Sequence, residues 1–410
     1  MKTTDYGKTW KDITGNLPKD AYTRVVREDE KRKGLLIAGT ELGVFISFND
    51  GQTWENFNLN LPVTPILDLK IKHDDLIIAT SGRSFWVLDD MGLIRQQDRT
   101  KRGIRLFQPE DAYLANGGSQ LNQSRESFDG TNSLSGVNPA NGIVIYYYLP
   151  TKMDTTELTM TIKNEMGEVI RIIRSERDET YQAYAGGPPA KPTISKKKGL
   201  NRFVWDMRYP IMKGAPTAYI EGSFRGHKVS PGTYTMELKA GDQVFDSSFK
   251  ILANPLYGLS QKDYEEYDTF MKTAEANVNE MHDMVNKMLK MRKQLKGLSK
   301  DITDASLKQE AKALIQQMKD WDEHMIQRKS KAYDDVENFK NKFTANYLFA
   351  INHAESDIPK VNQATKDRMA LLDAKWAAYK SEGKQILKTA IPALNQKLWE
   401  AGMGAIWTAK

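Results

Sequence analysis

Cysteine is absent from this chain of 410 residues, which excludes disulfide bonds, thiolate nucleophiles, iron–sulfur clusters and cysteine-ligated zinc. The chain contains no run of about 18 apolar residues, which is the length needed to span a bilayer, so we expect no transmembrane segment. A net charge of +6 over this length forms no concentrated basic stripe, so we expect no nucleic-acid partner. The five histidines are scattered, and nucleophile-elbow, P-loop and dinucleotide motifs are missing, so no metal or cofactor is expected.

An internal repeat is present in the first hundred residues. The octet TTDYGKTW at Thr3–Trp10 is matched by SFNDGQTW at Ser47–Trp54, and the same Asn-Leu-Pro tail follows each octet. The offset between the copies is 44 residues, which fits a four-stranded propeller blade of about 40–50 residues. Short β-rich runs predict strands at 24–28, 35–40, 44–48, 53–57, 66–70, 76–80 and 84–88.

Both octets match the Asp-box pattern, Ser/Thr-x-Asp-x-Gly-x-Thr-Trp, although the second copy has asparagine at the acidic position with an aspartate beside it. An Asp or Asn side chain accepts backbone N–H groups across a tight turn, and glycine takes the positive φ. The tryptophan is expected to fill the layer between blades. We therefore predict a structural role for Asp5, Gly7, Trp10, Asn49, Asp50, Gly51 and Trp54.

The first octet falls at the junction between the third and fourth strands of a blade. A propeller closes with about four to eight blades, because closure protects its strand edges. We therefore expect residues 1–107 to be the C-terminal blades of a truncated propeller, with the N-terminal blades of the same protein as partners. The first twenty residues lack the apolar segment of a signal peptide. If the chain is truncated as we expect, this absence carries no information about location.

The remainder of the chain predicts three further segments. Residues 108–140 are rich in Gly, Ser and Asn and predict a linker. Alternating strands over 141–256 predict an immunoglobulin- or fibronectin-III-like β-sandwich, in which alternate tyrosines of 143–149 fill the core. Patterns of period 3.6 over 257–410 predict an antiparallel helical bundle with a methionine-rich core. The fold class expected is therefore multidomain β plus α.

Within the predicted bundle, Ser260 and Asp263 are expected to cap a helix that ends near residue 296. Further helices are expected at about 304–339, 343–353 and 365–391.

Nearly the whole chain resembles the C-terminal region of secreted bacterial BNR/Asp-box propeller proteins, which are relatives of the sortilin (VPS10) propeller and are often labelled glycosyl hydrolase or sialidase-like. The match is carried by the two octets and by SGRSFWVLDD (81–90), NPANGIVIYYYLP (138–150), GLNRFVWDMRY (199–209), VSPGTY (229–234) and 395–407. The resemblance implies the order propeller, sandwich, bundle and an exported location, which is periplasmic, cell-surface or extracellular. It implies no particular reaction.

A sialidase of this class needs an arginine cluster, a Tyr–Glu pair and an Asp acid, which fall mainly in blades outside this chain, so no catalytic residue is predicted. Arg83 is the candidate to face a central channel and to clamp a sugar or peptide carboxylate. Glu41 and Asp89 are further ligand-binding candidates. The structural alternative is that Arg83 pairs with Glu41, Asp89 or Asp90 and joins neighbouring blades.

The leading hypothesis is a fragment of an exported Asp-box propeller protein that binds a glycan, protein or peptide and has no complete catalytic site. The alternative is a sialidase-like glycoside hydrolase whose active site lies mainly in the missing N-terminal blades, with Arg83 at its edge. A third hypothesis is a scaffold of a cell-surface complex that docks through its helical bundle.

Overall fold

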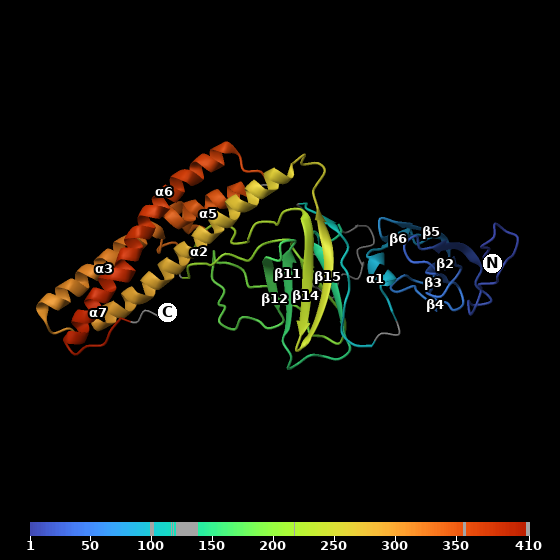
Figure 1. Cartoon of the computed structure of the whole chain (residues 1–410), viewed down its shortest axis with the longest axis horizontal. Coiled ribbons are helices and arrows are strands. Elements are labelled where there is room, and N and C mark those ends of the chain that lie inside the picture. Colours follow the sequence, from blue (N-terminus) through green and yellow to red (C-terminus); the bar gives the residue numbers. More distant parts are fainter. Residues whose placement is uncertain are drawn as a thin grey trace.

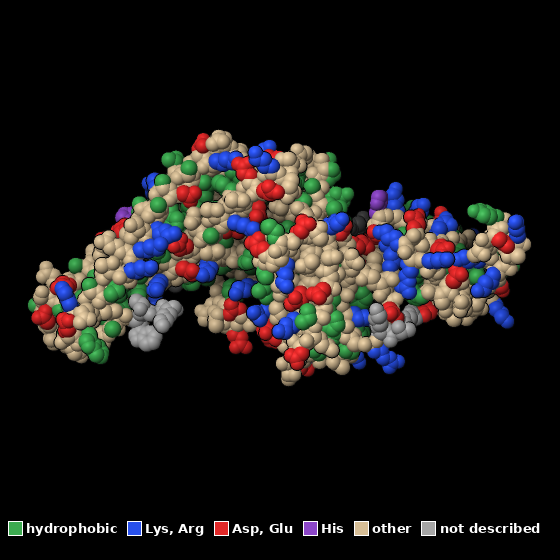
Figure 2. Space-filling model, viewed as in Figure 1, with side chains coloured by type: hydrophobic (Ala, Val, Ile, Leu, Met, Phe, Trp, Pro, Cys, Tyr) green, Lys and Arg blue, Asp and Glu red, His purple; other side chains and the backbone are tan. Residues whose placement is uncertain are grey.

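The computed structural model describes residues 1–98, 102–115, 117, 119, 138–216, 218–355 and 358–406. Several β-sheets precede a set of helices, so the mixed β and α fold class is confirmed at this level. Figure 1 shows two small sheets near the N-terminus, larger sheets in the middle and long helices at the other end. On the face drawn in Figure 2, cationic and anionic side chains are interspersed over all three parts.

Two antiparallel sheets occupy the first ninety residues, with the strand orders β1-β2-β3-β4 and β5-β6-β7. Runs of β-branched and aromatic residues form the strands, and turn residues separate them. The bounds are β1 Thr23–Glu28, β2 Leu36–Thr40, β3 Gly43–Ser47, β4 Glu55–Asn56, β5 Ile66–Lys72, β6 Asp75–Thr80 and β7 Phe85–Leu88, followed by the short helix α1 Met91–Arg95. These strands lie where the sequence predicts them, and β4 is shorter than expected.

The two N-terminal sheets share one apolar core. Val25 and Ile37 of the first sheet pack with Ile66 of the second, and all three are buried. Gly39 on β2 lies at a close approach between the sheets, because a Cβ atom there would lie 2.6 Å from Ile66 Cγ2 and 2.7 Å from Val25 Cγ1. The sheets therefore pack face against face, and the propeller that they would belong to stays a prediction.

Two larger sheets pack around a second core and form a β-sandwich. Their strand orders are β13-β10-β8 and β12-β11-β14-β15-β9, and every pair is antiparallel except β15 with β9. The bounds are β8 Arg105–Leu106, β9 Ala112–Tyr113, β10 Ile143–Leu149, β11 Leu158–Asn164, β12 Val169–Arg174, β13 Gly199–Trp205, β14 Gly232–Ala240 and β15 Gln243–Leu252. The immunoglobulin-like topology stays a prediction.

Strands β8 and β9 fall on either side of the expected boundary between 1–107 and 108–140, and both join the sandwich sheets. Most of the expected linker, 116 to 137 apart from 117 and 119, lies outside the described residues. The alternation predicted for 143–149 is confirmed, because Tyr147 is fully buried while Tyr146 and Tyr148 on the opposite face are only half-buried. Trp205 fills the same core.

The helices pack around a third core rich in methionine, as predicted. The capping box predicted at the start of the first helix is also confirmed, with the Ser260 side chain accepting the Asp263 N–H and Asp263 accepting the Ser260 N–H. The bounds are α2 Gln261–Leu298, α3 Ala305–Met325, α4 Asp335–Asn338, α5 Phe343–Ala354, α6 Gln363–Gln385, the π-helical turn η2 Ile386–Ala390 and α7 Ile391–Glu400.

The helix predicted over 304–339 is wrong in its second half. The chain leaves the helix at Ile326, where φ is −141°, and Arg328 turns back to pair with Asp322 at 2.8 Å between Nη2 and Oδ1. The carbonyl of Ser330 accepts the N–H of Tyr219 at 2.8 Å, so this segment covers a loop from the sandwich. Tertiary contacts have overridden a helical sequence pattern here.

The last predicted helix, 365–391, is too short. A π turn joins α6 to α7, and the helical path continues to Glu400. Pro392 lies in the first turn of α7, where its missing N–H is tolerated. Residue 407, at the end of the segment 395–407 that carries the resemblance, lies outside the described residues.

Candidate functional site

The three predicted ligand-binding residues lie on different turns of the N-terminal sheets. Glu41 follows β2 and accepts a hydrogen bond from Arg24 Nε at 2.7 Å, so its described ion pair is with a cross-strand neighbour. Arg83 is exposed on the β6–β7 turn, where its N–H donates to Thr80 Oγ1 at 3.1 Å. Asp89 follows β7. No described contact joins Glu41, Arg83 and Asp89 to one another.

Asp89 belongs to an acidic cluster where the second sheet meets the sandwich. Desolvation raises the pKa of Asp89, and the charges of Asp75 and Asp90 raise it further. Asp90 accepts a hydrogen bond of 2.6 Å from the hydroxyl of Tyr146 on β10. Burial raises the pKa of the nearby Glu110 to about 7, although its carboxylate accepts a backbone N–H. Burial thus raises the pKa of both Asp89 and Glu110 at a junction between parts of the fold, and the neighbouring carboxylates raise it further.

The two octets make equivalent hydrogen bonds. In the first, the hydroxyl of Thr3 accepts the Gly7 N–H at 2.8 Å and Asp5 Oδ1 accepts the Thr9 N–H at 2.9 Å. In the second, the corresponding bonds join Ser47 to Gly51, at 2.9 Å, and Asn49 to Thr53, also at 2.9 Å. Gly7 and Gly51 have φ of 88° and 78°, values that favour glycine. Asparagine therefore makes the same backbone contact as aspartate in this turn.

The tail of the first repeat clamps the tryptophan of the second. Asn16 Nδ2 donates to the Trp54 carbonyl at 2.9 Å, and the Trp54 N–H donates to Asn16 Oδ1 at 2.6 Å. The Trp54 indole N–H donates to the Ile13 carbonyl at 2.9 Å, and its ring is buried. Trp10, at the matching position of the first octet, exposes 57% of its surface. Trp54 is thus buried against the first sheet and the first tail, whereas Trp10 is exposed, and a layer between blades stays a prediction.

The second tail makes the same turn as the first. Gly15 and Leu59 occupy matching positions and share a φ of 50°. In both tails the following Asn-Leu-Pro turn is closed by a backbone bond from the leucine, of 3.0 Å in the first and 2.7 Å in the second. Asn60, which matches Asn16, is exposed and makes no hydrogen bond to the described residues.

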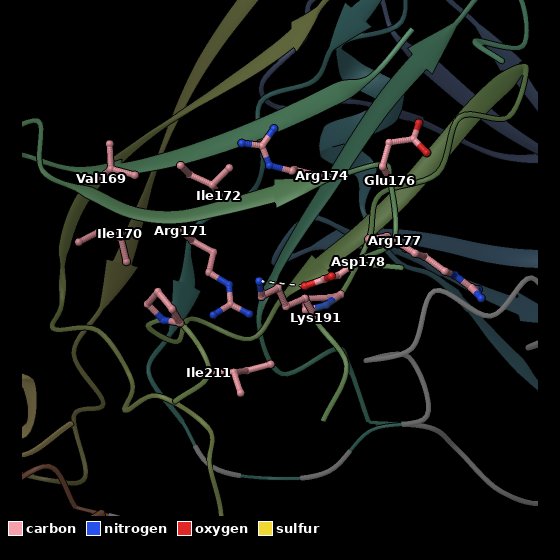
Figure 3. Close-up of a pocket in the computed structure, with 13 residues that line it drawn as sticks. Val169, Ile170, Arg171, Ile172, Arg174, Glu176, Arg177, Asp178, Lys191 and Ile211 are labelled. Carbon is pink, nitrogen blue, oxygen red and sulfur yellow. Dashed lines mark ion pairs between the residues drawn. The ribbon is translucent and has the colours of Figure 1, made fainter. Parts of the chain in front are cut away.

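A pocket of about 570 Å³ lies beside the sandwich, at the outer edge of β12. It is lined by β12 and by the segments 176–178, 191–193 and 210–211. Figure 3 shows Arg171 pointing from β12 into this space, with Ile211 and the Lys191–Asp178 pair beside it. A second pocket, of about 440 Å³, adjoins the first and shares Arg171 and Ile211.

Arg171 is the most unusual side chain of this pocket, because it is a buried guanidinium with only 7% of its surface exposed. Its Nη1 donates to the Tyr209 carbonyl at 2.7 Å, and its other donors make no hydrogen bond to the described residues. Burial lowers the pKa of Arg171, and only the charge of Asp206 opposes this effect. An arginine has five N–H donors arranged to bind carboxylates, so most of its capacity is unused here.

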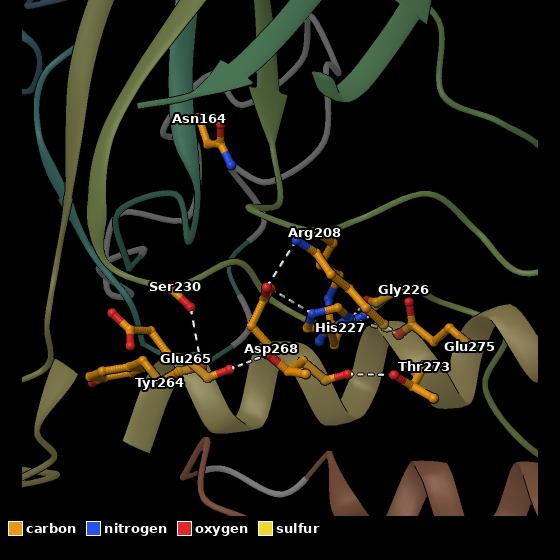
Figure 4. A network of polar contacts seen from close by, with 12 residues as sticks. Asn164, Arg208, Gly226, His227, Ser230, Tyr264, Glu265, Asp268, Thr273 and Glu275 are labelled. Atoms are coloured by element: carbon orange, nitrogen blue, oxygen red, sulfur yellow. Dashed lines mark hydrogen bonds and ion pairs between the residues drawn. The ribbon is translucent and has the colours of Figure 1, made fainter. Parts of the chain in front are cut away.

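A second polar cluster joins the sandwich to the helices. His227, which is fully buried, places Nδ1 3.0 Å from Glu275 Oε1 and Nε2 3.1 Å from Asp268 Oδ1 (Figure 4). Lys272 pairs with Asp268 at 3.0 Å, and the ring of Tyr209 stacks on His227 with 4.4 Å between centroids. Burial would lower the pKa of His227, but its bonds to Asp268 and Glu275 raise it above its ordinary value. This cluster holds α2 against the loop that follows β13.

Neither Arg171 nor His227 is among the candidate site residues predicted from the sequence. The signal for Arg171 was available, because it is a charged residue within an otherwise apolar run, VIRII, of a predicted strand. His227 has no comparable signal, since its two carboxylates lie 41 and 48 residues away in sequence. Among the described residues, no three His, Asp or Glu side chains gather as a metal site. None of the described helices is both long and apolar enough to cross a membrane.

No protein-family model matches this chain, and no curated protein matches it. One similar solved structure is PorZ, an essential bacterial surface component of the type-IX secretion system of Porphyromonas gingivalis. It is 13% identical, with a TM-score of 0.15, and the match covers 56% of this chain and 30% of PorZ. The other is the extracellular domain of the putative one component system BT4673 from B. thetaiotaomicron. It is 10% identical, with a TM-score of 0.16, and the match covers 57% of this chain and 25% of that one. The chain thus spans less than a third of either structure, and neither TM-score indicates a shared fold.

Proposed function

We propose that this chain is part of an exported protein that acts by binding a carboxylate-bearing protein, peptide or glycan ligand, and that the pocket at Arg171 is the binding site. The observation that carries the proposal is the guanidinium of Arg171, which is buried beside a pocket of about 570 Å³ with one hydrogen bond and no ion pair among the described residues. A buried charge is costly unless it is well compensated, and a ligand carboxylate would add an ion pair to the more distant charge of Asp206 that already acts on Arg171.

Arginine suits this role better than lysine would. Its planar guanidinium binds a carboxylate through two parallel N–H···O bonds, which fix the orientation of the ligand as well as its charge. We infer that Arg171, and not Arg83 as the sequence predicts, binds the ligand carboxylate. Arg83 is exposed on a turn, where water competes for its donors.

The proposal is tested by measuring binding and turnover together. The whole chain and its Arg171→Met variant are applied to arrays of acidic peptides and sialylated glycans, and released products are measured in the same wells. We expect the whole chain to bind without releasing product, and the variant to lose at least about tenfold in affinity. Cleavage of a glycan would support the glycoside hydrolase hypothesis instead. Equal binding by the variant would remove Arg171 from the site.

We propose further that residues 1–98 are consecutive Asp-box blades and that the first octet docks the tail of another such repeat, in N-terminal blades outside residues 1–410. The two hydrogen bonds between the Asn16 amide and the backbone of Trp54 support this docking, because they join the tail of one repeat to the octet of the next. Trp10 presents an equivalent octet that nothing in the described structure covers. The occupant would be an Ile-Thr-Gly-Asn-Leu-Pro type of segment, bound through its asparagine amide.

The synthetic peptide DITGNLPKD, which copies 12–20, tests this docking. We expect it to shift the tryptophan fluorescence of the whole chain to shorter wavelength, and we expect the Trp10→Phe variant to show no such shift. A peptide with alanine in place of asparagine is the control, and it should bind at least about tenfold more weakly because both amide bonds are lost. Equal binding of the two peptides would contradict the proposal.

A further inference from the structure

The outer edge of β12 is open to another strand. β12 is the edge strand of the five-stranded sheet. In an antiparallel strand, every second residue directs its N–H and carbonyl toward one neighbouring strand, and the residues between them direct theirs to the opposite side. The Ser175 N–H donates inward to the Leu158 carbonyl at 2.9 Å, whereas the Arg174 carbonyl accepts the Ile194 N–H at 3.1 Å from the outer side. Ile172, two residues before Arg174, therefore presents its N–H and carbonyl to the same outer edge.

The chain covers this edge at one place only within its described part. Thr193 forms a parallel bridge with Arg174. If that pairing continued by two residues, residue 192 would have to donate its N–H to the Ile172 carbonyl. Residue 192 is proline, which has no N–H. The backbone groups of Ile172 are thus left without a partner among the described residues.

The charges beside this edge favour an acidic ligand. Arg174 pairs with Glu157 at 2.9 Å and Lys191 with Asp178 at 3.5 Å, so these cations are already neutralised. Arg171, which points into the adjoining pocket, has no ion pair in the described structure, and the charge that acts on it there is that of Asp206. The Ile172 side chain exposes 50% of its surface at the rim and offers an apolar contact.

We propose that an extended acidic peptide adds to the outer edge of β12 at Ile172 and places an aspartate or glutamate carboxylate on the guanidinium of Arg171. Backbone bonds to Ile172 supply affinity that is independent of sequence, and the carboxylate contact supplies specificity. This inference rests on the proposed function and narrows its ligand from any carboxylate-bearing molecule to a peptide in β conformation.

The probe is a blocked, fluorescently labelled peptide of alternating valine and threonine with one central glutamate, and binding to the whole chain is followed by anisotropy. A peptide with glutamine in place of glutamate should bind at least about tenfold more weakly. Arg171→Met should weaken binding of the glutamate peptide to the same extent and should abolish the difference between the two peptides. Arg177→Met is the matched control, since Arg177 is exposed beside the same pocket, and it should change affinity by less than about twofold.

Two variants test the strand addition itself. Ile172→Pro removes the outward N–H, and we expect it to weaken peptide binding at least about tenfold. Pro192→Thr restores the N–H of residue 192, which can then donate to the Ile172 carbonyl. Because the chain would now cover its own sheet edge, this variant should also bind the peptide more weakly than the unaltered chain does. Pro192→Thr does not depend on the edge tolerating a proline, so it remains informative if Ile172→Pro fails to fold.

The outcomes separate this inference from the function on which it rests. If Arg171→Met weakens binding but Ile172→Pro and Pro192→Thr do not, strand addition is wrong and the carboxylate site stands. If blocked glutamate or sialyllactose binds Arg171 as tightly as the peptide does, strand addition is equally wrong. If Arg171→Met has no effect on any of these ligands, the proposed function itself fails.

Discussion

We expect the buried His227 cluster to make the interface between the sandwich and the helices sensitive to pH. Replacing His227 by glutamine keeps one hydrogen bond and removes the positive charge between Asp268 and Glu275. Breaking a buried ion pair costs about 3–5 kcal/mol in general. Here Asp268 retains Lys272 and Glu275 retains the backbone N–H of residue 227, so we expect a loss of about 2–3 kcal/mol in the free energy of unfolding.

The pH dependence has a definite sign. The pKa of His227 is raised in the folded state. The stabilisation that its ion pairs add to the free energy of unfolding is therefore fully present below the unfolded-state pKa of about 6.5, and it is lost as the pH rises through the folded-state pKa. The pKa of Asp268 is lowered: burial opposes this, and the bonds from His227 and Lys272 outweigh it. The contribution of Asp268 is therefore present above about 3.9 and is lost as the pH falls through its folded value.

We therefore expect the difference in stability between the chain and its His227→Gln variant to be largest between about pH 5 and 6.5. It should shrink on the alkaline side, once the imidazolium loses its proton. Urea unfolding followed by far-UV circular dichroism across this range measures the difference, and His324→Gln, at an exposed position on α3, is the matched control. A difference that stays constant from about pH 5 to 9, or that grows with pH, would refute the ion-pair argument.

Three further predictions concern the N-terminal sheets and their junction. Asn16→Ala should lower stability by about 1–3 kcal/mol in urea unfolding, because both bonds to Trp54 are lost, whereas Asn60→Ala at the matching exposed position should change it by less than about 0.5 kcal/mol. Gly39→Ala should cost about 1–3 kcal/mol in the same assay, because a Cβ atom does not fit between the two sheets. Glu110→Gln should stabilise the protein above about pH 7 and not near pH 4, since the folded carboxyl has a pKa of about 7; a stabilisation independent of pH would contradict this.

Much of the fold could be predicted from the sequence because it is set by local patterns. Successive side chains of the strand IVIYYYL point to opposite faces, so Tyr147 is buried while Tyr146 and Tyr148 are half-buried. Ser260 and Asp263 have the spacing of a capping box, and α2 begins there. The two octets differ at their acidic position and still form the same turn, since an asparagine oxygen accepts the same N–H.

The candidate site could not be predicted in this way, because distant segments build it. The sequence pattern continues past Met325, but the contact of Arg328 with Asp322 and the bond between Tyr219 and Ser330 end α3 there. Arg83 is predicted from the sequence as a ligand-binding residue because it should face the central channel of a propeller, and the structure places it on an exposed turn. Arg171 has the buried position and unused donors that ligand binding needs, and its burial depends on the chain around residue 209.

Hydrogen exchange at one backbone amide tests the central claim most directly. The Ile172 N–H points to an open sheet edge, so in the free chain it should exchange faster than the amides of Arg171 and Ile173, which face β11. When the glutamate peptide is added at saturating concentration, Ile172 exchange measured by NMR should slow by at least about tenfold. A bound peptide that leaves the Ile172 exchange rate unchanged would contradict the account.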